Sequence, residues 1–575
     1  MTTQQGEWVA AIGIDDLAVG GRKLFRHYDK RIAIFRTEQA VYAVDNRCPH
    51  QGYALLQGEM RGETLTCAWH NWKFELDENG TCSFGGEAVR AYPVRVNQGQ
   101  VFVDVTDPSA EVIAPQLFQS LLEAMGDVDI GRMARDTLRI RQIGRPLADV
   151  VREGVMYGAP RMEYGWNHSL ATLTDCLHLA AMFEGELQAF PVIQGMSVVA
   201  QNEVRRPFRP RPDPIDPVEL YGSIDDALAA YPVLVDEERG DEAEGLLRGL
   251  IAVGVDKARI RHALLSAITD HFLGYGHPMI YAQKSFEMLE TVGWGEADTV
   301  LGPLVPSTVL ATRYDRLPYM RKFNRAFQEL APDLGRQATA GGHASFDARR
   351  FTLAVLDADA ETACRALSEA LDSGVAVLLL LDAISRAAAE RLRRFDIDID
   401  LDDTNEWGWL DVTHNLTYLD ALRWAWSVDS SPEVLRGLYH AVWFVNFTRQ
   451  LDERAPRTRP EPWVNSDTGI VLDAIRAKDP EGVEAAIAGF QGPQEDLRGA
   501  LAHGASEDNS VAPIMVAHAV KTARASIVES EIIGDRAPMI AAGRFLASPK
   551  RERFVYNATL EAIDFTRGRA RGEAS

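Results

Sequence analysis

Cysteine and long apolar runs are both scarce in this sequence. Five cysteines in 575 residues are too few for a disulfide framework. No stretch approaches the roughly 18 apolar residues that span a bilayer, and the most apolar run, residues 375–381, suits only a buried helix. The opening residues, MTTQQGEWVAAIGIDD, lack a basic segment followed by an apolar run, so they do not resemble a secretory signal. We therefore expect a cytoplasmic protein with no membrane partner.

Positive charge is also in deficit. The chain has 60 lysines and arginines against 83 aspartates and glutamates, which gives a formal net charge of −23 and a pI of about 5.1. Nucleic acids and anionic membranes would be repelled by such a chain, so we expect neither as a partner. An acidic surface suits a basic redox partner, although acidic proteins are common whatever they bind.

Short β-branched and aromatic runs separated by turn residues fill the N-terminal part of the chain. They lie at residues 24–26, 32–35, 41–44 and 101–105 and indicate strands. The sequence DENG at residues 77–80 lies between two further runs, and its Asn-Gly pair predicts a two-residue hairpin turn. Residues 1–108 are therefore predicted to be a small all-β domain.

The hydrophobic period changes after this domain. Residues 117–125, 363–371, 375–395 and 416–426 place apolar residues at helical spacing, which predicts a mostly helical region from residue 115 to 575. A chain of 575 residues is too long for one hydrophobic core, so several domains are expected. The predicted fold class is multidomain α+β, an all-β domain followed by a large all-α region.

The helical region also shows weak internal similarity. EYGW at residues 163–166 recurs as EWGW at 406–409, TDCL at 174–177 resembles LDAL at 419–422, and RGLIAVG at 248–254 matches RGALAHG at 498–504. These pairs predict an internal duplication, with copies at 115–310 and 346–575 joined by a connection at 311–345. Chance similarity between helical sequences is the alternative.

Two short motifs in the β domain each combine one cysteine with one histidine. Cys48-Pro-His50 and Cys67-Ala-Trp-His70 would supply two thiolates and two imidazoles from two loops. A [2Fe-2S] cluster with cysteines on one iron and histidines on the other needs such a set. A tetrahedral zinc site could use the same residues, but zinc fingers usually place a cysteine pair before a histidine pair.

The residues around these motifs resemble those of the Rieske family, as found in ferredoxins and ring-hydroxylating oxygenases. CPHQG at 48–52, CAWHNWKF at 67–74, the Gly85-Gly86 pair and YPV at 92–94 carry the resemblance, which extends over residues 7–106. It implies a [2Fe-2S] cluster held by Cys48, His50, Cys67 and His70, with both histidines at an exposed tip through which electrons leave.

One departure from the respiratory members of that family is informative. Those proteins carry an extra cysteine in each loop, whereas here Gly52 and Asn71 neighbour the ligands and no spare cysteine is present. The resemblance therefore implies the oxygenase-like subset, in the lower part of a range of about −150 to +300 mV. Cys82 is expected to be a small packed side chain.

A Rieske cluster joined to a large helical region requires an electron acceptor, and the helical histidines are the candidates. We predict that His414, His440, His503 and His518 include at least two ligands of a second metal, with His271 or His277 contributed by the first copy. Asp411 or Asp420 would supply a carboxylate, as in bundle-core iron sites. A lone histidine on a half-apolar helix is more often only a core or surface residue.

Two family patterns bear on that second site. Asp175-Cys-Leu-His178 starts the Asp-x-x-His pattern of ring-hydroxylating oxygenases, but no second histidine follows closely. LAHG at 501–504, VAHAV at 516–520 and DHFLGYGHPMIY at 270–281 faintly resemble questin-oxidase-like helical proteins. That resemblance implies an oxidase of aromatic compounds with few cofactors.

The leading hypothesis is a Rieske oxidoreductase that passes electrons from the cluster to a non-haem iron site, where O2 is activated to react with a small organic substrate, an aromatic compound being one option. No glycine-rich nucleotide loop follows a strand, so an external ferredoxin or NAD(P)H-dependent reductase would supply the electrons. A homo-oligomer is compatible with the sequence. The alternatives are a non-enzymatic electron carrier or redox sensor with a helical docking platform, and an enzyme whose helical part works without its own metal.

The sequence also concentrates tryptophan in the second copy. These side chains could line an aromatic substrate pocket or pack in the core, and they are Trp407, Trp409, Trp424, Trp426 and Trp443.

Overall fold

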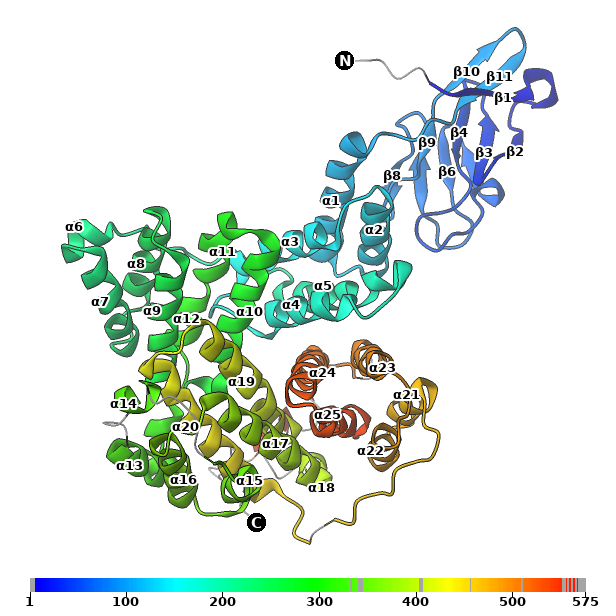
Figure 1. Ribbon diagram of the computed structural model, residues 1–575. Helices are drawn as coiled ribbons and strands as arrows, with labels where there is room; N and C mark the ends of the chain where they lie inside the picture. The colour runs from blue at the N-terminus through cyan, green and yellow to red at the C-terminus, as the bar shows by residue number, and fades with distance from the viewer. Residues whose placement is uncertain are drawn as a thin grey trace. The chain divides into compact units, whose positions relative to one another are not determined.

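The computed structural model describes residues 6–330, 334–339, 345–402, 407–455, 457–507 and 510–550, together with residues 555, 558, 559, 562, 563 and 566. Glu406 of the second tryptophan motif lies outside these residues. The chain divides into two compact units, one made of Met1–Ala124 and Asp129–Arg145 and the other of Met125–Val128 and Pro146–Ser575. Figure 1 shows that strands build most of the first unit and helices the second.

The first unit contains three antiparallel sheets. The first has the order β1-β11-β10, the second β2-β3-β4-β9 and the third β5-β6-β7-β8. The strands are β1 (Trp8–Gly13), β2 (Arg22–His27), β3 (Lys30–Arg36), β4 (Val41–Asp45), β5 (Glu59–Arg61), β6 (Thr64–Thr66), β7 (Lys73–Glu75), β8 (Thr81–Phe84), β9 (Ala91–Tyr92), β10 (Val94–Asn97) and β11 (Gln100–Asp104). The predicted N-terminal β region is confirmed.

The predicted hairpin at residues 77–80 is present with a longer connection. β7 and β8 pair as neighbours, with Glu75 opposite Thr81, so residues 76–80 join them rather than two turn residues. Asn79 and Gly80 both have positive φ, of 58° and 77°. A Cβ on Gly80 would lie 2.4 Å from the carbonyl oxygen of Val89, so only glycine fits this position.

Two helices complete the first unit beyond the predicted boundary at residue 108. They are α1 (Ala110–Asp127) and α2 (Ile130–Gln142). Asp129 caps α2 by accepting a hydrogen bond of 2.9 Å from the backbone N–H of Arg132. Salt bridges from Arg135 and Arg139 to Glu87, in the loop after β8, hold α2 against the strands.

The second unit is helical, as the spacing of apolar residues predicts. Its first half contains α3 (Leu147–Gly158), α4 (His168–Ala180), α5 (Ala189–Glu203), α6 (Pro217–Tyr221), α7 (Ile224–Asp236), α8 (Gly240–Ala252), α9 (Lys257–Asp270), α10 (His277–Val292), α11 (Ala297–Leu301), α12 (Leu304–Val309) and α13 (Arg321–Leu330). Its second half contains α14 (Leu334–Thr339), α15 (Ala348–Asp357), α16 (Ala360–Asp372), α17 (Val377–Arg394), α18 (Ile397–Leu401), α19 (Trp409–Val428), α20 (Pro432–Phe447), α21 (Thr468–Arg476), α22 (Pro480–Ala488), α23 (Gln494–Ser506), α24 (Pro513–Ile533) and α25 (Ala537–Ala547). Among the residues described, no helix combines the length and apolar character that a membrane crossing requires.

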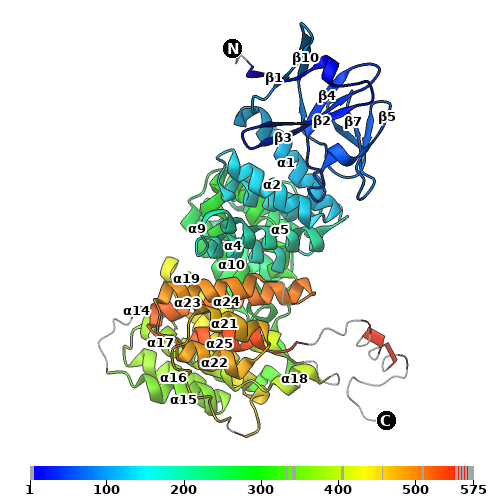
Figure 2. The same cartoon turned by 90° about the vertical axis from the view of Figure 1, so that its right-hand side faces the viewer.

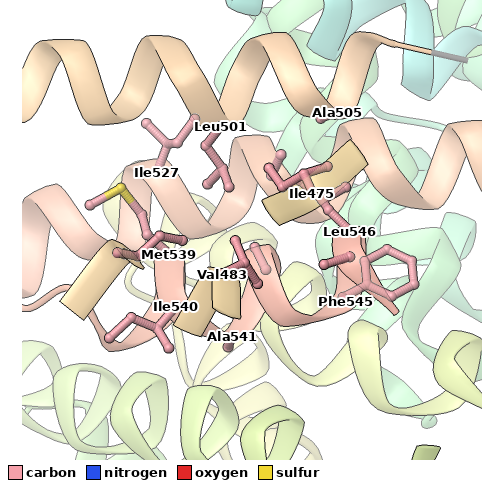
Figure 3. Close-up of a cluster of buried hydrophobic side chains, with 14 of the residues drawn as sticks. Ile475, Val483, Leu501, Ala505, Ile527, Met539, Ile540, Ala541, Phe545 and Leu546 are labelled. Atoms are coloured by element: carbon pink, nitrogen blue, oxygen red, sulfur yellow. The ribbon is translucent and has the colours of Figure 1, made fainter. Parts of the chain in front are cut away.

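A large apolar core lies among the C-terminal helices. Figure 3 shows Leu501 of α23, Ile527 of α24 and Phe545 of α25 as members of one cluster of buried apolar side chains, and all three are buried. Trp409, which is 0% exposed, packs on Phe395 and Phe545 with ring centres 4.4 and 5.3 Å away. Trp409 is therefore a core residue rather than part of a substrate pocket.

Four helices from distant parts of the chain pack together in the second unit. α10 and α24 each contact both α4 and α19, and Figure 2 shows α4, α10 and α24 one below another in the view. α4 and α10 come from the predicted first copy, and α19 and α24 from the second. This bundle positions the candidate site.

Candidate functional sites

The two motifs of the β region form loops of the same backbone shape. The N–H of Cys48 donates to the carbonyl of Tyr53 (2.8 Å), and the carbonyl of Cys48 accepts from Gly52 (2.8 Å). Cys67 repeats this pattern with Trp72 (2.7 Å) and Asn71 (3.2 Å). Gly52 and Asn71 occupy equivalent positions and both have positive φ, of 75° and 61°. The local hydrogen bonds thus fold each loop around its own cysteine.

The side chains of the two loops face one another. Cys48 and Cys67 are buried, and the rings of His50 and His70 meet edge to face with centres 4.5 Å apart. His50 also stacks on Trp72, with ring centres 4.8 Å apart. Burial raises the pKa of the Cys48 thiol to about 11, so a bound cation is needed to hold it as a thiolate. Two thiolates and two imidazoles so placed fit a [2Fe-2S] cluster.

A second group of ligands lies in the helical unit. Nitrogen atoms of His168, His277, His414 and His518 all lie within 4.8 Å of one another. The Nε2 atom of His277 is 3.0 Å from Nε2 of His168 and 2.9 Å from Nε2 of His414. We call these four residues the histidine cluster.

Local structure places each of these side chains. His277 is the first residue of α10, and the three residues before it, Gly274, Tyr275 and Gly276, all have positive φ, which turns the chain sharply into the helix. A Cβ on Gly276 would lie 2.6 Å from the Tyr418 ring. His168 is the first residue of α4. His414 and His518 lie near the beginnings of α19 and α24.

Backbone carbonyls determine which ring nitrogen carries the proton. Nδ1 of His277 bonds to the carbonyl of Gly274, Nδ1 of His414 to that of Leu410, and Nδ1 of His518 to that of Ile514 (2.7 Å). A carbonyl only accepts, so each Nδ1 carries the proton and each neutral ring keeps its lone pair on Nε2. The unprotonated Nε2 atoms of His277 and His414 therefore lie 2.9 Å apart with no proton to share, an arrangement that a cation bound by both lone pairs would stabilise.

The electrostatics of the cluster disfavour a proton as that cation. Burial, and then the ammonium of Lys521, lowers the pKa of His277 to about 3 and holds the pKa values of His168 and His414 well below 6.5. Nζ of Lys521 lies 3.0 Å from Nε2 of His414. Burial lowers the pKa of Lys521 itself to about 7.

The observed separations suit a metal ion. Two imidazole nitrogens bound about 2.1 Å from one ion at a right angle lie about 3.0 Å apart. Hydrogen bonds from the second ring nitrogen to backbone carbonyls are also typical of metal-binding histidines, because they fix the tautomer and the orientation of the ring. Nε2 of His518 is buried and has no hydrogen-bond partner among the described residues, as expected of a nitrogen that is available to a metal. An all-imidazole set suits zinc, copper, iron or nickel.

A cavity of about 370 Å³ adjoins the cluster. Its walls combine the four histidines with aromatic, aliphatic and acidic side chains, namely Tyr275, Tyr314, Trp407, Leu410, Asp411 and Ile514. Asp411 caps α19 by accepting a hydrogen bond of 2.7 Å from the N–H of Gly408. Burial raises the pKa of Asp411 to about 6, and burial and then Asp411 raise the pKa of Tyr275. The cavity can hold a small, largely apolar molecule beside the cluster.

The structure brings together three of the six histidines that the sequence singled out. His277, His414 and His518 meet in the cluster, whereas His440, His503 and His271 lie elsewhere. His440 packs against the rings of Phe272 and Phe323. His503 packs on Phe183 and bonds to Glu507 at 3.1 Å. His271 lies between Asp315 and Asp236, at 2.8 and 3.1 Å.

The two carboxylates considered as ligands also separate. Asp411 lines the cavity, but Asp420 accepts a hydrogen bond of 3.0 Å from Gln283. The buried Asp175 lies together with the half-buried His178 and Glu287, and Nζ of Lys284 lies 2.8 Å from Asp175 and 3.0 Å from Glu287. The single ammonium of Lys284 thus pairs with both of these carboxylates, and its charge would oppose the binding of a metal ion there.

Sequence reasoning did not include His168 and Lys521 in the site. His168 follows the EYGW motif by two residues, and His414 follows the EWGW motif by five, so the paired motifs were the available signal. Nothing comparable marks Lys521, whose proximity to His414 depends on how α24 packs on α19.

Comparisons with known proteins concern the β region. The family of the Rieske [2Fe-2S] domain matches residues 7–93. The ferredoxin component of the naphthalene 1,2-dioxygenase system of Pseudomonas putida is 24% identical over 101 residues, which are 17% of this chain and 97% of the ferredoxin. The oxygenase subunit of carnitine monooxygenase from Escherichia coli (strain K12) is 33% identical over 117 residues, which are 18% of this chain and 31% of that subunit.

A solved structure of the same kind is similar in its sequence. The ferredoxin of carbazole 1,9a-dioxygenase from Nocardioides aromaticivorans IC177 is 25% identical, with 17% of this chain and 98% of the ferredoxin covered and a TM-score of 0.17. The chain thus spans nearly all of the ferredoxins but less than a third of the carnitine monooxygenase subunit. Taken with the loop geometry, the family match identifies residues 7–93 of this chain as a Rieske [2Fe-2S] domain.

Proposed function

We propose that this chain is an oxidoreductase in which the Rieske cluster supplies single electrons to a non-haem iron ion bound by His168, His277, His414 and His518. The observation that carries the proposal is the pair of unprotonated Nε2 atoms of His277 and His414, which lie 2.9 Å apart with their tautomers fixed by backbone carbonyls. A cluster that delivers electrons calls for a redox-active acceptor, which favours iron over zinc.

The ion would activate O2, and the side chains around it would bind and orient the substrate. The cavity beside the histidine cluster would hold a small organic substrate against Trp407 and Tyr275, with Asp411 available to accept a hydrogen bond from a substrate hydroxyl. Sequence similarity of the Rieske segment to the oxygenase subunit of carnitine monooxygenase supports an oxygenase reaction. An external ferredoxin or NAD(P)H-dependent reductase would deliver the electrons.

The proposal includes the internal duplication. Each predicted copy contributes two members of the cluster, His168 and His277 from the first and His414 and His518 from the second. The two tryptophan motifs lead into α4 and α19, which carry His168 and His414. A duplicated helical unit whose copies face each other would bring such residues to a shared centre.

Metal content and electron transfer test the proposal. Iron analysis of the purified full-length protein should give about three irons per chain, two of them in the cluster. Anaerobically reduced protein mixed with air-saturated buffer should reoxidise its Rieske chromophore faster than a variant with both His277 and His414 replaced by alanine. Two irons per chain with equal reoxidation rates would favour an electron carrier or sensor instead.

A further inference from the structure

The helical hairpin of α1 and α2 is tied to the Rieske domain through a buried carboxylate. Glu87 follows β8 and is only 7% exposed. Its Oε2 lies 2.9 Å from Nη2 of Arg135, and its Oε1 binds Arg139. The family match ends at residue 93, before the residues of this hairpin. The contact is therefore formed by helices that lie outside the matched domain.

A second set of buried polar groups keeps α2 in place. Asp136 is fully buried, accepts a hydrogen bond of 2.6 Å from Ser120 of α1 and lies 3.2 Å from Arg139. Arg132 binds Glu123 of α1 at 2.7 Å. Because Asp136 and Arg132 are buried, loss of their partners would leave uncompensated buried charges, and these contacts therefore hold α2 against α1.

Arg135 is the member of this network that reaches the cluster loop. Its Nη1 donates a hydrogen bond of 3.3 Å to the carbonyl oxygen of His50, a cluster ligand, while its Nε and Nη2 donate to Glu87 at 3.1 and 2.9 Å. The guanidinium thus lies between the buried carboxylate and the backbone of the ligand loop. Trp72 covers the ring of His50 by stacking.

Reduction adds one negative charge to the cluster, so fixed charges near its ligands change the reduction potential. A positive charge stabilises the reduced form and a negative charge destabilises it. Arg135 and Glu87 therefore act in opposite directions, and Arg135 is the one that is bonded to the ligand loop. Partial burial strengthens such effects because water screens the charges less.

We propose that Arg135 is a positioning residue that raises the reduction potential of the Rieske cluster, with Glu87 holding its guanidinium against the His50 loop. The proposal rests on the Rieske assignment and not on the histidine cluster. On this proposal the hairpin of α1 and α2, which lies outside the matched Rieske residues, adjusts the reduction potential of the cluster through Arg135.

Redox titrations of the full-length protein, followed by the EPR signal of the reduced cluster, test the proposal. R135Q should lower the potential, reducing the ratio of reduced to oxidised cluster at a fixed ambient potential by about tenfold, equivalent to about 59 mV for one electron. R135K keeps the charge and should stay within about threefold of wild type. E87Q removes the opposing negative charge but also releases the guanidinium from the His50 loop, and because these two effects oppose each other its shift should be smaller than that of R135Q.

The matched control is R139Q, which removes the same charge from the same helix at a residue that binds Glu87 and Asp136. Its effect should be much smaller than that of R135Q. Equal shifts of the same sign in R135Q, R139Q and E87Q would indicate a loosened hairpin and overturn the proposal. An unshifted potential in R135Q with a normal EPR signal would also overturn it, whereas a wild-type protein without that signal would instead refute the cluster assignment.

Discussion

The ammonium of Lys521 lies 3.0 Å from Nε2 of His414 in the buried interior of the helical unit. Lys521 is thus a cation that competes with a metal ion for the same lone pair. Burial has already lowered the pKa of Lys521 to about 7, so near neutral pH this lysine carries the competing charge only part of the time, unlike an ordinary lysine. The affinity of the histidine cluster for a metal ion should therefore depend on Lys521, which lies three positions after His518 in the sequence.

Removing this competing cation should strengthen metal binding. We expect K521M to bind Fe²⁺ or Zn²⁺ at the histidine cluster about tenfold more tightly, because the ion no longer approaches a fixed positive charge. Titration of metal-depleted protein against a chromophoric chelator measures the change. K257M, at an exposed lysine of the same unit, should bind like wild type. Weaker binding in K521M would mean that the lysine supports the site.

Alanine replacements should separate the cluster from the other helical histidines. H277A and H414A should lose the second metal, since each removes a nitrogen that lies about 3 Å from a neighbouring ligand atom. H440A and H503A should retain it, because their rings pack on phenylalanines instead. The Rieske EPR signal and the helical circular dichroism should persist in all four variants. Retention of the metal in both H277A and H414A would exclude the proposed site.

The reduction potential should respond to the ligand set. H70C, provided that the cluster assembles, should lower the potential, because an anionic thiolate in place of a neutral imidazole stabilises the oxidised cluster. C82S is the matched control, since Cys82 packs beside Gly85 and Trp72 and is not one of the four ligands. Wild-type protein should show the low average g-value of a histidine-ligated cluster. Stoichiometric zinc without visible absorbance would contradict the assignment.

Stability should depend on pH through His271. Burial lowers the pKa of His271, but the carboxylates of Asp315 and Asp236 outweigh it and hold the pKa above its usual 6.5. A raised folded-state pKa means that the contribution is fully present below about pH 6.5 and is lost as the pH rises through the folded-state value. H271Q should therefore lower the melting temperature more at pH 5.5 than at pH 9. A destabilisation that grows with pH would contradict this sign, and D315N should reduce the same pH dependence.

The Rieske loops could be predicted because their structure is local. Each ligand pair lies within four residues, and each loop is closed by backbone hydrogen bonds to residues four and five positions further along. The strands around them follow from β-branched runs that are buried in the sheets, such as Ile32 and Ile34 of β3. The hairpin after β7 was less predictable, because its length also depends on the close approach of Val89 to Gly80.

The membership of the histidine cluster could be predicted only in part from the sequence. Motif spacing and apolar periodicity were enough to predict a two-loop [2Fe-2S] site, a helical remainder and a set of candidate histidines in that remainder. The packing of the helices shows that His168 belongs with His277, His414 and His518, while His440 faces Phe272 and Phe323. The physical reason is that these ligands come from four separate helices, so their meeting depends on the rotation and crossing of each helix, which side-chain packing throughout the unit sets.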